Sequence, residues 1–321
     1  MTQAPVFIIN PKSHKVKIRG SILKRIAVNY PDIPIIYFDG RTPLDETLSP
    51  LLGQGKGTIY VEGGDGTVCA TLSTCFAEQS SGSTLPRLAI LPGGSTNLAH
   101  EILGLKRVDP GALRQRLDQR DQRTDDLEIT THKALLVETA ETETPLVGLL
   151  LSTGSLARLM LYTQDNLHGK TRGVVSIARA ILQLTLFPRS TKHSDGLPLI
   201  RPSPFTHITE DGENSPYDTA FTVFSTFQTL SLGISPFWRR GDAQIGFTYA
   251  AWPIRRLRFG ILKAVLGSAP SALERHALTS EGCSEMVFQT DGPVIIDGEE
   301  LPLPKDKIFR VSASPDLEFL R

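Results

Sequence analysis

Three glycines and one aspartate, Gly63, Gly64, Asp65 and Gly66, form a segment with the composition of a phosphate-binding turn. The segment follows an apolar run, and a helical pattern begins near Thr67. Backbone N–H groups at a turn that opens a helix form an anion site, and glycine leaves room for a phosphate on the main chain. We expect some of these glycines to adopt positive φ, and we expect Thr67 to cap the helix and to donate its hydroxyl to a phosphate oxygen.

The aspartate in this turn would repel a phosphate unless a cation or a proton lay between them. Asp65 therefore indicates Mg²⁺, or a hydroxyl group that is to be deprotonated. For this motif taken alone, a tight turn with a solvated aspartate is the alternative.

Two further polar turns follow apolar runs, "INPKSHK" (9–15) and "LPGGSTNLAHEI" (91–102). If the preceding runs are parallel strands, all three turns lie at one edge of one sheet. Such a set of turns is typical of a site for a nucleoside triphosphate. The candidate binding residues in these two turns are Asn10, Lys12 and Ser13 in the first, and Gly94, Ser95 and Asn97 in the second.

The first part of the chain alternates between strand-like and helix-like patterns. Apolar runs rich in β-branched residues occupy 5–10, 33–38, 57–63 and 87–93, and helical spacing follows at 18–30, 44–52, 67–78 and 97–105. This alternation predicts right-handed βαβ units and a parallel sheet that is covered on both faces. Residues 1–128 are therefore predicted to form an α/β nucleotide-binding domain.

The pattern changes after a polar stretch, and residues 129–321 are predicted to form a second, antiparallel β domain. Strand-like runs occupy 133–139, 145–153, 220–230 and 243–250, and one long helix is predicted over 171–187. Residues 201–218, which are rich in Pro, Asp, Glu and Ser, are predicted to form loops.

Length and composition fit a two-domain folded protein. The chain has 321 residues with 34 basic and 34 acidic side chains, so its net charge gives no indication of a nucleic-acid partner. Three cysteines without a CxxC motif favour a reducing, cytoplasmic compartment. Neither a signal-peptide pattern nor a run of 18 apolar residues is evident, and we expect a protein that is neither exported nor membrane-spanning.

Four short motifs, taken together, resemble the diacylglycerol kinase catalytic-domain superfamily, which includes bacterial lipid kinases, sphingosine kinases and ceramide kinases. These motifs are "NPKS" (10–13), "GGDGT" (63–67), "PGGSTN" (92–97) and "DGE" (297–299). The resemblance implies an α/β ATP-binding domain, a β-sandwich lipid-binding domain whose last strand returns to the first domain, and an active site in the cleft between the two domains.

The resemblance also implies roles for particular residues. Asn10, the Gly63–Thr67 turn and Ser95 would contact ATP, Asp65 would act with Mg²⁺ and the phosphates, and Glu299 would be the general base. The segment "VIIDGEELPLP" (294–304) by itself reads as strand, tight turn and strand. From the residues alone, the alternative for Glu299 is a solvated hairpin tip.

The resulting hypothesis is an ATP- and Mg²⁺-dependent lipid kinase of phospholipid metabolism. It would transfer the γ-phosphate of ATP to the hydroxyl of a lipid such as diacylglycerol or a sphingoid lipid. One alternative is an NAD kinase-like phosphotransferase, which shares GGDGT. Another is a catalytically degenerate module that binds nucleotide or lipid, and the sequence does not identify the acceptor.

Three positions depart from the pattern of the superfamily. Leu98 and Leu156 stand where relatives carry aspartate, and Arg240-Gly241 stands where many relatives carry an acidic loop linked to a metal. These departures put a second, structural metal in doubt and favour the degenerate alternative.

Two basic stretches that contain tryptophan, "FWRRGD" (237–242) and "AWPIRRLRFGILKAVLG" (251–267), are suited to docking on anionic lipid headgroups. An ordinary helix with a buried apolar side and a solvated basic side is the alternative. We therefore expect a cytoplasmic protein that can associate peripherally with the inner membrane face, and a homodimer is left open.

Overall fold

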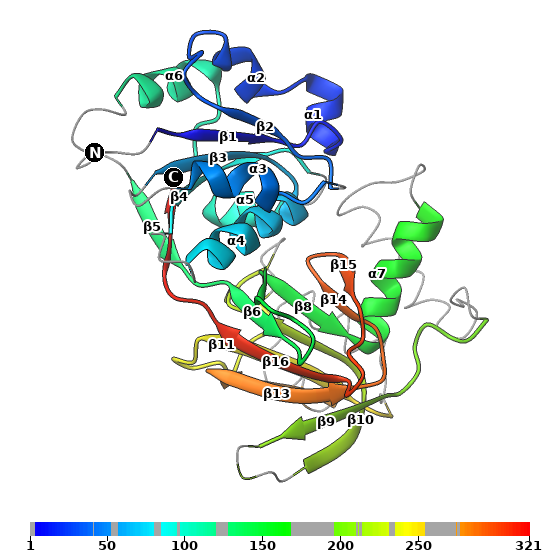
Figure 1. Cartoon of the computed structure of the whole chain (residues 1–321). Coiled ribbons are helices and arrows are strands. Elements are labelled where there is room, and N and C mark those ends of the chain that lie inside the picture. The colour runs from blue at the N-terminus through cyan, green and yellow to red at the C-terminus, as the bar shows by residue number, and fades with distance from the viewer. Residues whose placement is uncertain are drawn as a thin grey trace. The chain divides into compact units, whose positions relative to one another are not determined.

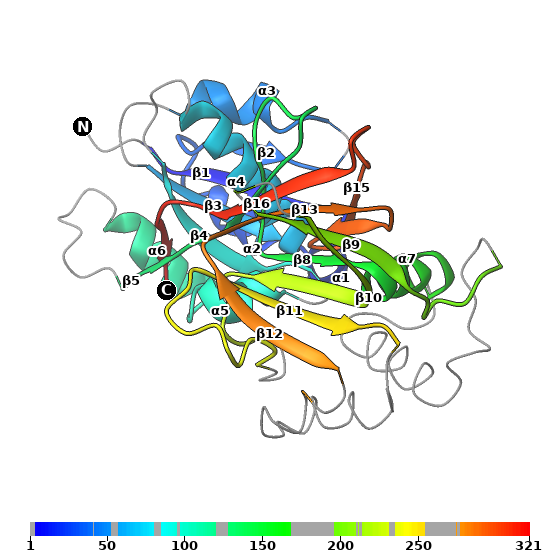
Figure 2. The same ribbon diagram turned by 90° about the horizontal axis from the view of Figure 1, so that it is seen from below.

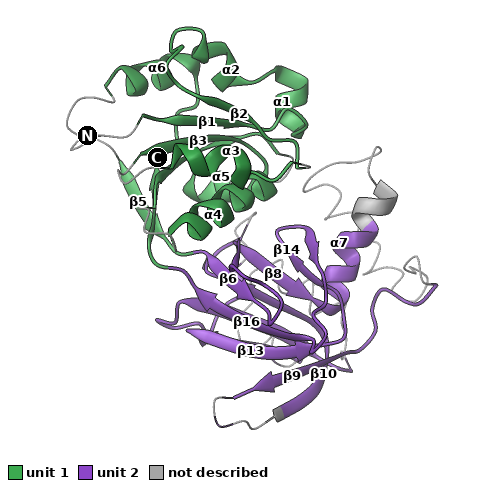
Figure 3. Cartoon of the chain, viewed as in Figure 1, with its two compact units in different colours: residues 1–133, 315–321 green, residues 134–314 purple. Residues whose placement is uncertain are grey.

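The computed structural model describes residues 4–40, 42–52, 57–79, 85–94, 97–119, 128–167, 196–209, 211, 214–230, 235–253, 274 and 277–321. The chain divides into two compact units (Figure 3). Unit 1 comprises residues 1–133 and 315–321, and unit 2 comprises residues 134–314. The first unit extends beyond the predicted boundary at residue 128, because β5 (Ile129–His132) pairs with the C-terminal strand β17 (Leu317–Leu320).

Unit 1 contains a six-stranded sheet in the order β2-β1-β3-β4-β17-β5. The first four strands in this order pair in parallel, β17 pairs in parallel with β4, and β5 is antiparallel to β17. The α/β architecture predicted from the sequence is therefore confirmed. The remaining strands of this sheet are β1 (Val6–Ile9), β2 (Ile35–Tyr37), β3 (Thr58–Gly63) and β4 (Arg87–Pro92).

Helices cover both faces of this sheet (Figure 1). The predicted helix 18–30 is two helices in the structure, because Gly20 has φ +76° and Ser21 caps the next helix by accepting the Lys24 N–H. A short helix over 110–118 was missed, although Asp109-Pro110 is a helix-start signal. The helices are α1 (His14–Arg19), α2 (Ile22–Ala27), α3 (Asp45–Leu48) with the 3₁₀ helix η1 (Ser49–Leu51), α4 (Asp65–Gln79), α5 (Leu98–Leu103) and α6 (Pro110–Asp118).

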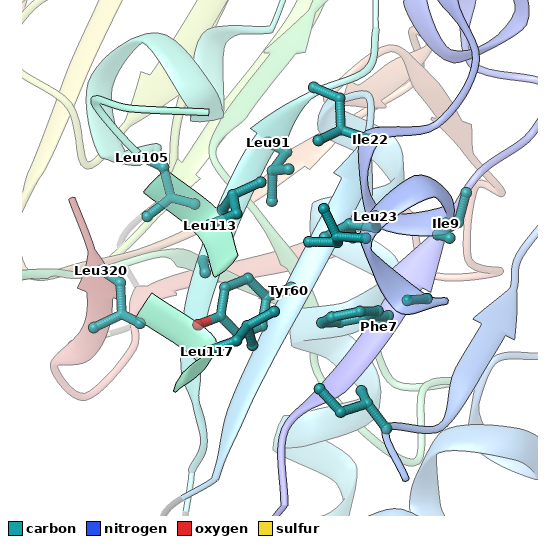
Figure 4. Close-up of a cluster of buried hydrophobic side chains, with 14 of the residues drawn as sticks. Phe7, Ile9, Ile22, Leu23, Tyr60, Leu91, Leu105, Leu113, Leu117 and Leu320 are labelled. Carbon is teal, nitrogen blue, oxygen red and sulfur yellow. The ribbon is translucent and has the colours of Figure 1, made fainter. Parts of the chain in front are cut away.

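The core between one face of this sheet and α1, α2 and α6 is built from alternate residues of the strands (Figure 4). Phe7 on β1 and Tyr60 on β3 are register partners, and their rings meet edge to face at 5.6 Å. Leu23 on α2 and Leu117 on α6 are almost fully buried in the same cluster. Burial of a side chain of this size contributes about 1.5–3 kcal/mol, so this core fixes the sheet whose edge carries the polar turns.

Unit 2 is antiparallel β structure, as predicted. Its described strands form an eleven-stranded sheet, and Figure 2 shows the adjacent strands β10, β11 and β12. The strands are β6 (Leu135–Glu138), β7 (Leu146–Gly148), β8 (Leu150–Thr153), β9 (Ser203–Ile208), β10 (Asn214–Ser225), β11 (Ile245–Ala251), β12 (Leu278–Cys283), β13 (Glu285–Thr290), β14 (Val294–Ile296), β15 (Glu299–Leu301) and β16 (Ile308–Ala313).

The core of unit 2 is rich in phenylalanine. Phe224 and Phe247 stack at 4.5 Å, and Phe205 and Phe288 stack at 5.0 Å, within one cluster that includes residues from β6, β8 and β14 as well. One sheet thus curls around a single core, which gives the inner packing that a two-sheet sandwich would give.

Two sequence predictions for unit 2 differ from the structure. The predicted loop over 201–218 contains β9 and the start of β10, which pair as an antiparallel hairpin. The single run 145–153 is two strands, β7 and β8, and β8 is followed by α7 (Gly154–Leu167), which was not predicted. The predicted helix 171–187 lies outside the described residues. None of the described helices has the length and apolar composition needed to cross a membrane.

Candidate active site

The three polar turns follow the carboxyl ends of the adjacent parallel strands β1, β3 and β4. The chain passes from β1 to β2 on one side and returns to β3 on the other, so the strand order reverses between β1 and β3. Ligands of open α/β sheets bind outside the carboxyl ends of the strands at such a switch point. Backbone bonds hold the turns together, since Asn10 N–H donates to Glu62 O at 2.9 Å and Lys15 N–H donates to Gly93 O at 2.7 Å.

The glycines of the second and third turns pack backbone against backbone. A Cβ atom on Gly93 would lie 2.6 Å from the Cα of Gly63, and a Cβ on Gly94 would lie 2.7 Å from the Cα of Gly64. The prediction that some glycines of the GGDG turn adopt positive φ is wrong, because none of its three described glycines does so. Close approach of the two turns, rather than unusual φ angles, requires glycine here.

Asn10 joins the first turn to the GGDG turn. Its side-chain amide donates to the hydroxyl of Thr67 at 2.9 Å, and its carbonyl oxygen accepts the N–H groups of Lys12 and Ser13 at 3.0 and 3.1 Å. Helix α4 begins at Asp65, so Thr67 lies in its first turn and not at its cap as predicted. Asn10 therefore sets the shape of the NPKS turn and the orientation of the Thr67 hydroxyl.

Asp65 holds the start of α5. Its carboxylate accepts the N–H of Leu98 at 3.2 Å and the N–H of Ala99 at 2.9 Å. These are the first amides of α5, which have no acceptor within that helix. Burial raises the pKa of Asp65 although both N–H bonds lower it. A carboxylate that burial disfavours in this way is a candidate functional group as well as a structural one.

Asn97 closes the PGGSTN turn on itself. Its Oδ1 accepts the Gly94 N–H at 2.7 Å, its Nδ2 donates to the Gly94 carbonyl at 2.8 Å, and its own φ is +56°. The side chain is buried and serves the turn rather than a ligand at these two atoms. The predicted ATP contact Ser95 lies outside the described residues.

A second buried carboxylate, Glu62, was missed in the sequence. It lies at the end of β3, is fully buried, and accepts the hydroxyl of Ser21 at 2.6 Å and the N–H groups of Ile22 and Leu23 at 3.0 Å. Its other neighbour is Arg19, 3.6 Å away, which also donates to the Pro92 carbonyl at 2.5 Å. The available signal was an acid inside an otherwise apolar strand, because a buried charge requires partners.

Lys12 and Ser13 complete the first turn. Ser13 precedes α1 without using its side chain to cap that helix, and it is half-buried. Lys12 is exposed, and its ammonium lies 2.7 Å from the carboxylate of Asp39. Unit 1 thus brings together Asn10, Lys12, Ser13, Gly63, Gly64, Asp65, Gly66, Thr67, Gly94 and Asn97 at one sheet edge.

Glu299 belongs to unit 2, where β14 and β15 form the expected hairpin. The two turn residues, Asp297 and Gly298, have φ of +49° and +94°, as the tight two-residue turns of hairpins require. The Asp297 carboxylate accepts the N–H groups of Leu149 and Leu150 at 2.8 and 3.0 Å. Asp297 is therefore the anchor of this turn, and Glu299 is left exposed beside it.

The three departures have distinct structural settings. Leu98 is buried and supplies an amide to Asp65, while Leu156 is half-buried in α7. Arg240 donates to the backbone carbonyls of Thr226, Ala243 and Gln244 at 2.6, 2.7 and 2.5 Å. Its guanidinium thus supplies a positive charge to this loop. Among the described residues, no three His, Cys, Asp or Glu side chains form a group that could hold a metal.

In the described part of the predicted membrane-docking segment, both arginines are engaged with other groups of the protein. Arg240 is engaged with the three carbonyls, and exposed Arg239 pairs with Glu274 at 2.7 Å. Trp252 is partly exposed. The other basic residues, within 254–267, lie outside the described residues, and docking on anionic lipid stays a prediction.

The family model described as "Diacylglycerol kinase catalytic domain" matches residues 4–129, which include the three turns. This segment is similar to that family's catalytic domain. The catalytic domain so matched contains β1 to β4 and all three turns. No curated protein matches the chain in sequence.

Solved structures show the same fold. A crystal structure of a diacylglycerol kinase from Bacillus anthracis str. Sterne covers 99% of this chain and 97% of its own, with a TM-score of 0.59 and 14% identity. A second structure from this strain, described as a proposed diacylglycerol kinase, has a TM-score of 0.64 and 15% identity over 99% of this chain and 95% of its own. At these identities the likeness shows the fold alone, and it covers both units of the chain.

Proposed function

We propose that this chain is a lipid kinase that depends on ATP and Mg²⁺. It transfers the γ-phosphate of ATP to the hydroxyl of a lipid such as diacylglycerol or a sphingoid lipid. The observation that carries the proposal is the diacylglycerol kinase catalytic domain over residues 4–129, with three polar turns at its switch point. Kinases of this kind work mainly by positioning and by electrostatic stabilisation of the transferred phosphoryl group.

The hydrogen bonds of the two glycine-rich turns favour one place for the triphosphate. The N-terminus of α5 already receives the Asp65 carboxylate, whereas at the start of α4 the N–H groups of Thr67 and Val68 donate to the backbone carbonyl of Gly64, at 2.9 and 3.2 Å. The positive end of a helix of this length attracts phosphate. We therefore assign the phosphates to the start of α4, with Lys12 and Ser13 as further donors from the neighbouring turn.

Asp65 fits Mg²⁺ as a single carboxylate ligand. Mg²⁺ binds proteins through one or two carboxylates and takes its other ligands from phosphate oxygens and water. The donor set fits this mode, since each Asp65 oxygen accepts one N–H and keeps further lone pairs. When bound, the ion would neutralise negative charge on the phosphates.

Glu299 is the proposed general base. In the reaction, the lipid hydroxyl oxygen forms a bond to the γ-phosphorus while the bond to the ADP oxygen breaks, and the hydroxyl proton passes to the Glu299 carboxylate. Exposure at the hairpin keeps this carboxylate accessible to an acceptor from solution or from a lipid surface. General-base catalysis of this kind contributes roughly 10²–10⁴ in rate.

The test uses the full chain with labelled ATP, Mg²⁺ and mixed micelles that contain diacylglycerol, a sphingoid base or a total lipid extract. We expect one labelled phospholipid product, and we expect Glu299→Gln to reduce its formation by about 10²–10⁴. Glu300→Gln is the matched control, because Glu300 is also exposed but points to the other face of the same strand. Chelation of Mg²⁺ should abolish transfer while the thermal midpoint stays unchanged.

Three results would contradict the proposal. Full turnover by Glu299→Gln would contradict the assignment of Glu299 as the general base. Formation of labelled NADP from NAD would support the NAD kinase-like alternative. Nucleotide binding without transfer to any lipid would support a binding module.

A further inference from the structure

Helix α1 holds the start of the PGGSTN turn at two successive carbonyl groups. The Lys15 N–H donates to the carbonyl of Gly93 at 2.7 Å, and the Arg19 guanidinium donates to the carbonyl of Pro92 at 2.5 Å. The backbone makes the first contact, so that contact does not depend on the type of residue. A side chain makes the second contact, which is therefore specific to an arginine at this position.

The peptide group between Pro92 and Gly93 is held at both of its polar atoms. Its carbonyl accepts a hydrogen bond from Nη2 of Arg19, and its N–H donates to the carbonyl of Gly63 at 2.8 Å. Pro92 is the last residue of β4 and the register partner of Gly63. This peptide group cannot rotate without breaking one of the two bonds. The direction in which the PGGSTN turn leaves the sheet is therefore set at this peptide group.

A buried carboxylate orients the guanidinium. Oε1 of Glu62 lies 3.6 Å from the same Nη2 atom of Arg19, and the side chain of Glu62 is fully buried whereas that of Arg19 is 34% exposed. Glu62 is itself held by the Ser21 hydroxyl and by the first amides of α2. A buried carboxylate requires such partners and attracts a nearby cation more strongly than an exposed one does. This attraction keeps Arg19 beside the Pro92 carbonyl.

The PGGSTN turn in turn supports the GGDG turn. A Cβ on Gly93 would lie 2.6 Å from the Cα of Gly63, and a Cβ on Gly94 would lie 2.7 Å from the Cα of Gly64. Because the two backbones are in such close contact, a displacement of the PGGSTN turn displaces the GGDG turn as well. The proposed function places the phosphates at the start of α4, directly after Gly64.

We propose that Arg19 is a positioning residue for the bound nucleotide, which acts through the Pro92 carbonyl and does not touch the nucleotide itself. The pair of Glu62 and Arg19 joins the residue before the GGDG turn to the first residue of the PGGSTN turn, and so fixes how the two turns meet. Neither residue belongs to the four motifs of the sequence. The inference rests on the proposed use of ATP and adds two residues on which the shape of that site depends.

The test measures the binding of MgATP to the full chain by calorimetry, at low and at high ionic strength. We expect Arg19→Gln to weaken binding about tenfold, less than the roughly 10²-fold that a misplacement of about 1 Å can cost. Arg19→Lys should bind more tightly than Arg19→Gln, because one nitrogen atom makes both contacts and an ammonium can replace it. Lys17→Gln is the matched control, since Lys17 is exposed in the same last turn of α1 and its loss removes the same charge.

A second measurement needs no nucleotide. Amide hydrogen exchange at Gly93, whose N–H donates to Gly63, should be faster in Arg19→Gln than in the wild type and unchanged in Lys17→Gln. Circular dichroism verifies that each variant is folded at the temperature of the experiment. If Arg19 served stability alone, its loss would lower the thermal midpoint and leave the affinity of the folded variant for MgATP unchanged.

The outcomes separate this inference from the function on which it rests. Equal affinities of the wild type and Arg19→Gln, or of Arg19→Lys and Arg19→Gln, overturn the positioning role while the use of ATP stands. An equal loss in Lys17→Gln, or a loss that disappears at high ionic strength, also overturns it, because charge alone would then attract the phosphates. If the wild type does not bind MgATP, both the proposed function and this inference are overturned.

Discussion

The GGDG turn of unit 1 and the DGE turn of unit 2 each contain an Asp-Gly dipeptide, and the aspartate acts in the same way in both. The Asp65 carboxylate accepts two consecutive backbone amides from α5, and the Asp297 carboxylate accepts two consecutive amides at the start of β8. In each unit, one aspartate ties a turn to a segment that is distant in sequence. Both carboxylates are therefore structural anchors before any chemistry is assigned to them.

The two turns differ in why they need glycine and in where the proposed reactive acid lies. Gly63 and Gly64 meet Gly93 and Gly94 backbone to backbone, whereas Gly298 is required by its φ of +94°. In the first turn the anchor and the candidate metal ligand are one residue. In the hairpin the anchor is Asp297 and the candidate base is a separate, exposed glutamate. Removal of Glu299 should therefore leave the shape of the hairpin unchanged, whereas removal of the Asp65 carboxylate also removes the acceptor of two α5 amides.

The largest expected effect tests the two requirements for glycine. Gly93→Ala would place Cβ 2.6 Å from backbone atoms of Gly63, and overpacking against a rigid backbone should lower the free energy of unfolding by about 3 kcal/mol. Gly298→Ala should cost less, about 1–2 kcal/mol, because it only forces an L-residue to positive φ. Chemical denaturation measures both values. Gly111→Ala, in the first turn of α6, is the unit 1 control and should change stability little.

Equal losses for Gly93→Ala and Gly298→Ala would contradict the comparison. The same holds if Gly93→Ala is tolerated, because the two glycine-rich turns would then not be in the close contact described above.

The next effect tests the two anchors. Asp65→Ala leaves two amides of α5 without their acceptor and should cost about 2 kcal/mol. Asp297→Gly is the matching change in the hairpin, because glycine keeps the positive φ. Amide hydrogen exchange should accelerate at Leu98 and Ala99 in the first variant only, and at Leu149 and Leu150 in the second only. Faster exchange at both pairs of amides in either variant would show that each aspartate affects more than its own turn.

The strands of unit 1 could be predicted from the sequence, because short β-branched runs between glycine-rich turns leave few alternatives. The predicted bounds of β1, β3 and β4 agree with the structure to within about one residue. The sheet edge that carries the turns could therefore be predicted as well. The helix over 18–30 could not, because its interruption at Gly20-Ser21 depends on Glu62, which is distant in sequence.

The contacts within the site were the least predictable part. Asp65 and Asn97 were identified by residue type, but their backbone partners depend on how the two glycine-rich turns meet in three dimensions. Positive φ was expected in the GGDG turn because glycine commonly serves that purpose, whereas here it serves close approach. In unit 2, β9 was predicted as loop because its composition is polar, and pairing with β10 and β13 outweighs that local preference.

The smallest expected effect concerns the charge of Asp65, which the comparison makes both an anchor and a candidate metal ligand. Burial raises its pKa above the usual 3.8, so the folded state binds this proton more tightly than the unfolded state does. The stability from this group is therefore fully present below about pH 4 and is lost as the pH rises through the folded pKa. Asp65→Asn keeps one acceptor oxygen and removes the charge, so the stability of this variant should not fall in this way as the pH rises.

Denaturation curves from pH 4 to pH 8 measure the difference between wild type and Asp65→Asn. We expect the wild type to lose stability relative to the variant as the pH rises, by an amount that is small beside the cost of Asp65→Ala. Transfer to lipid should nevertheless fall in Asp65→Asn, because the charge that costs stability is the one proposed to act on Mg²⁺ and the phosphates. A parallel pH dependence in both proteins, or wild-type transfer by the variant, would leave Asp65 as an anchor alone, like Asp297.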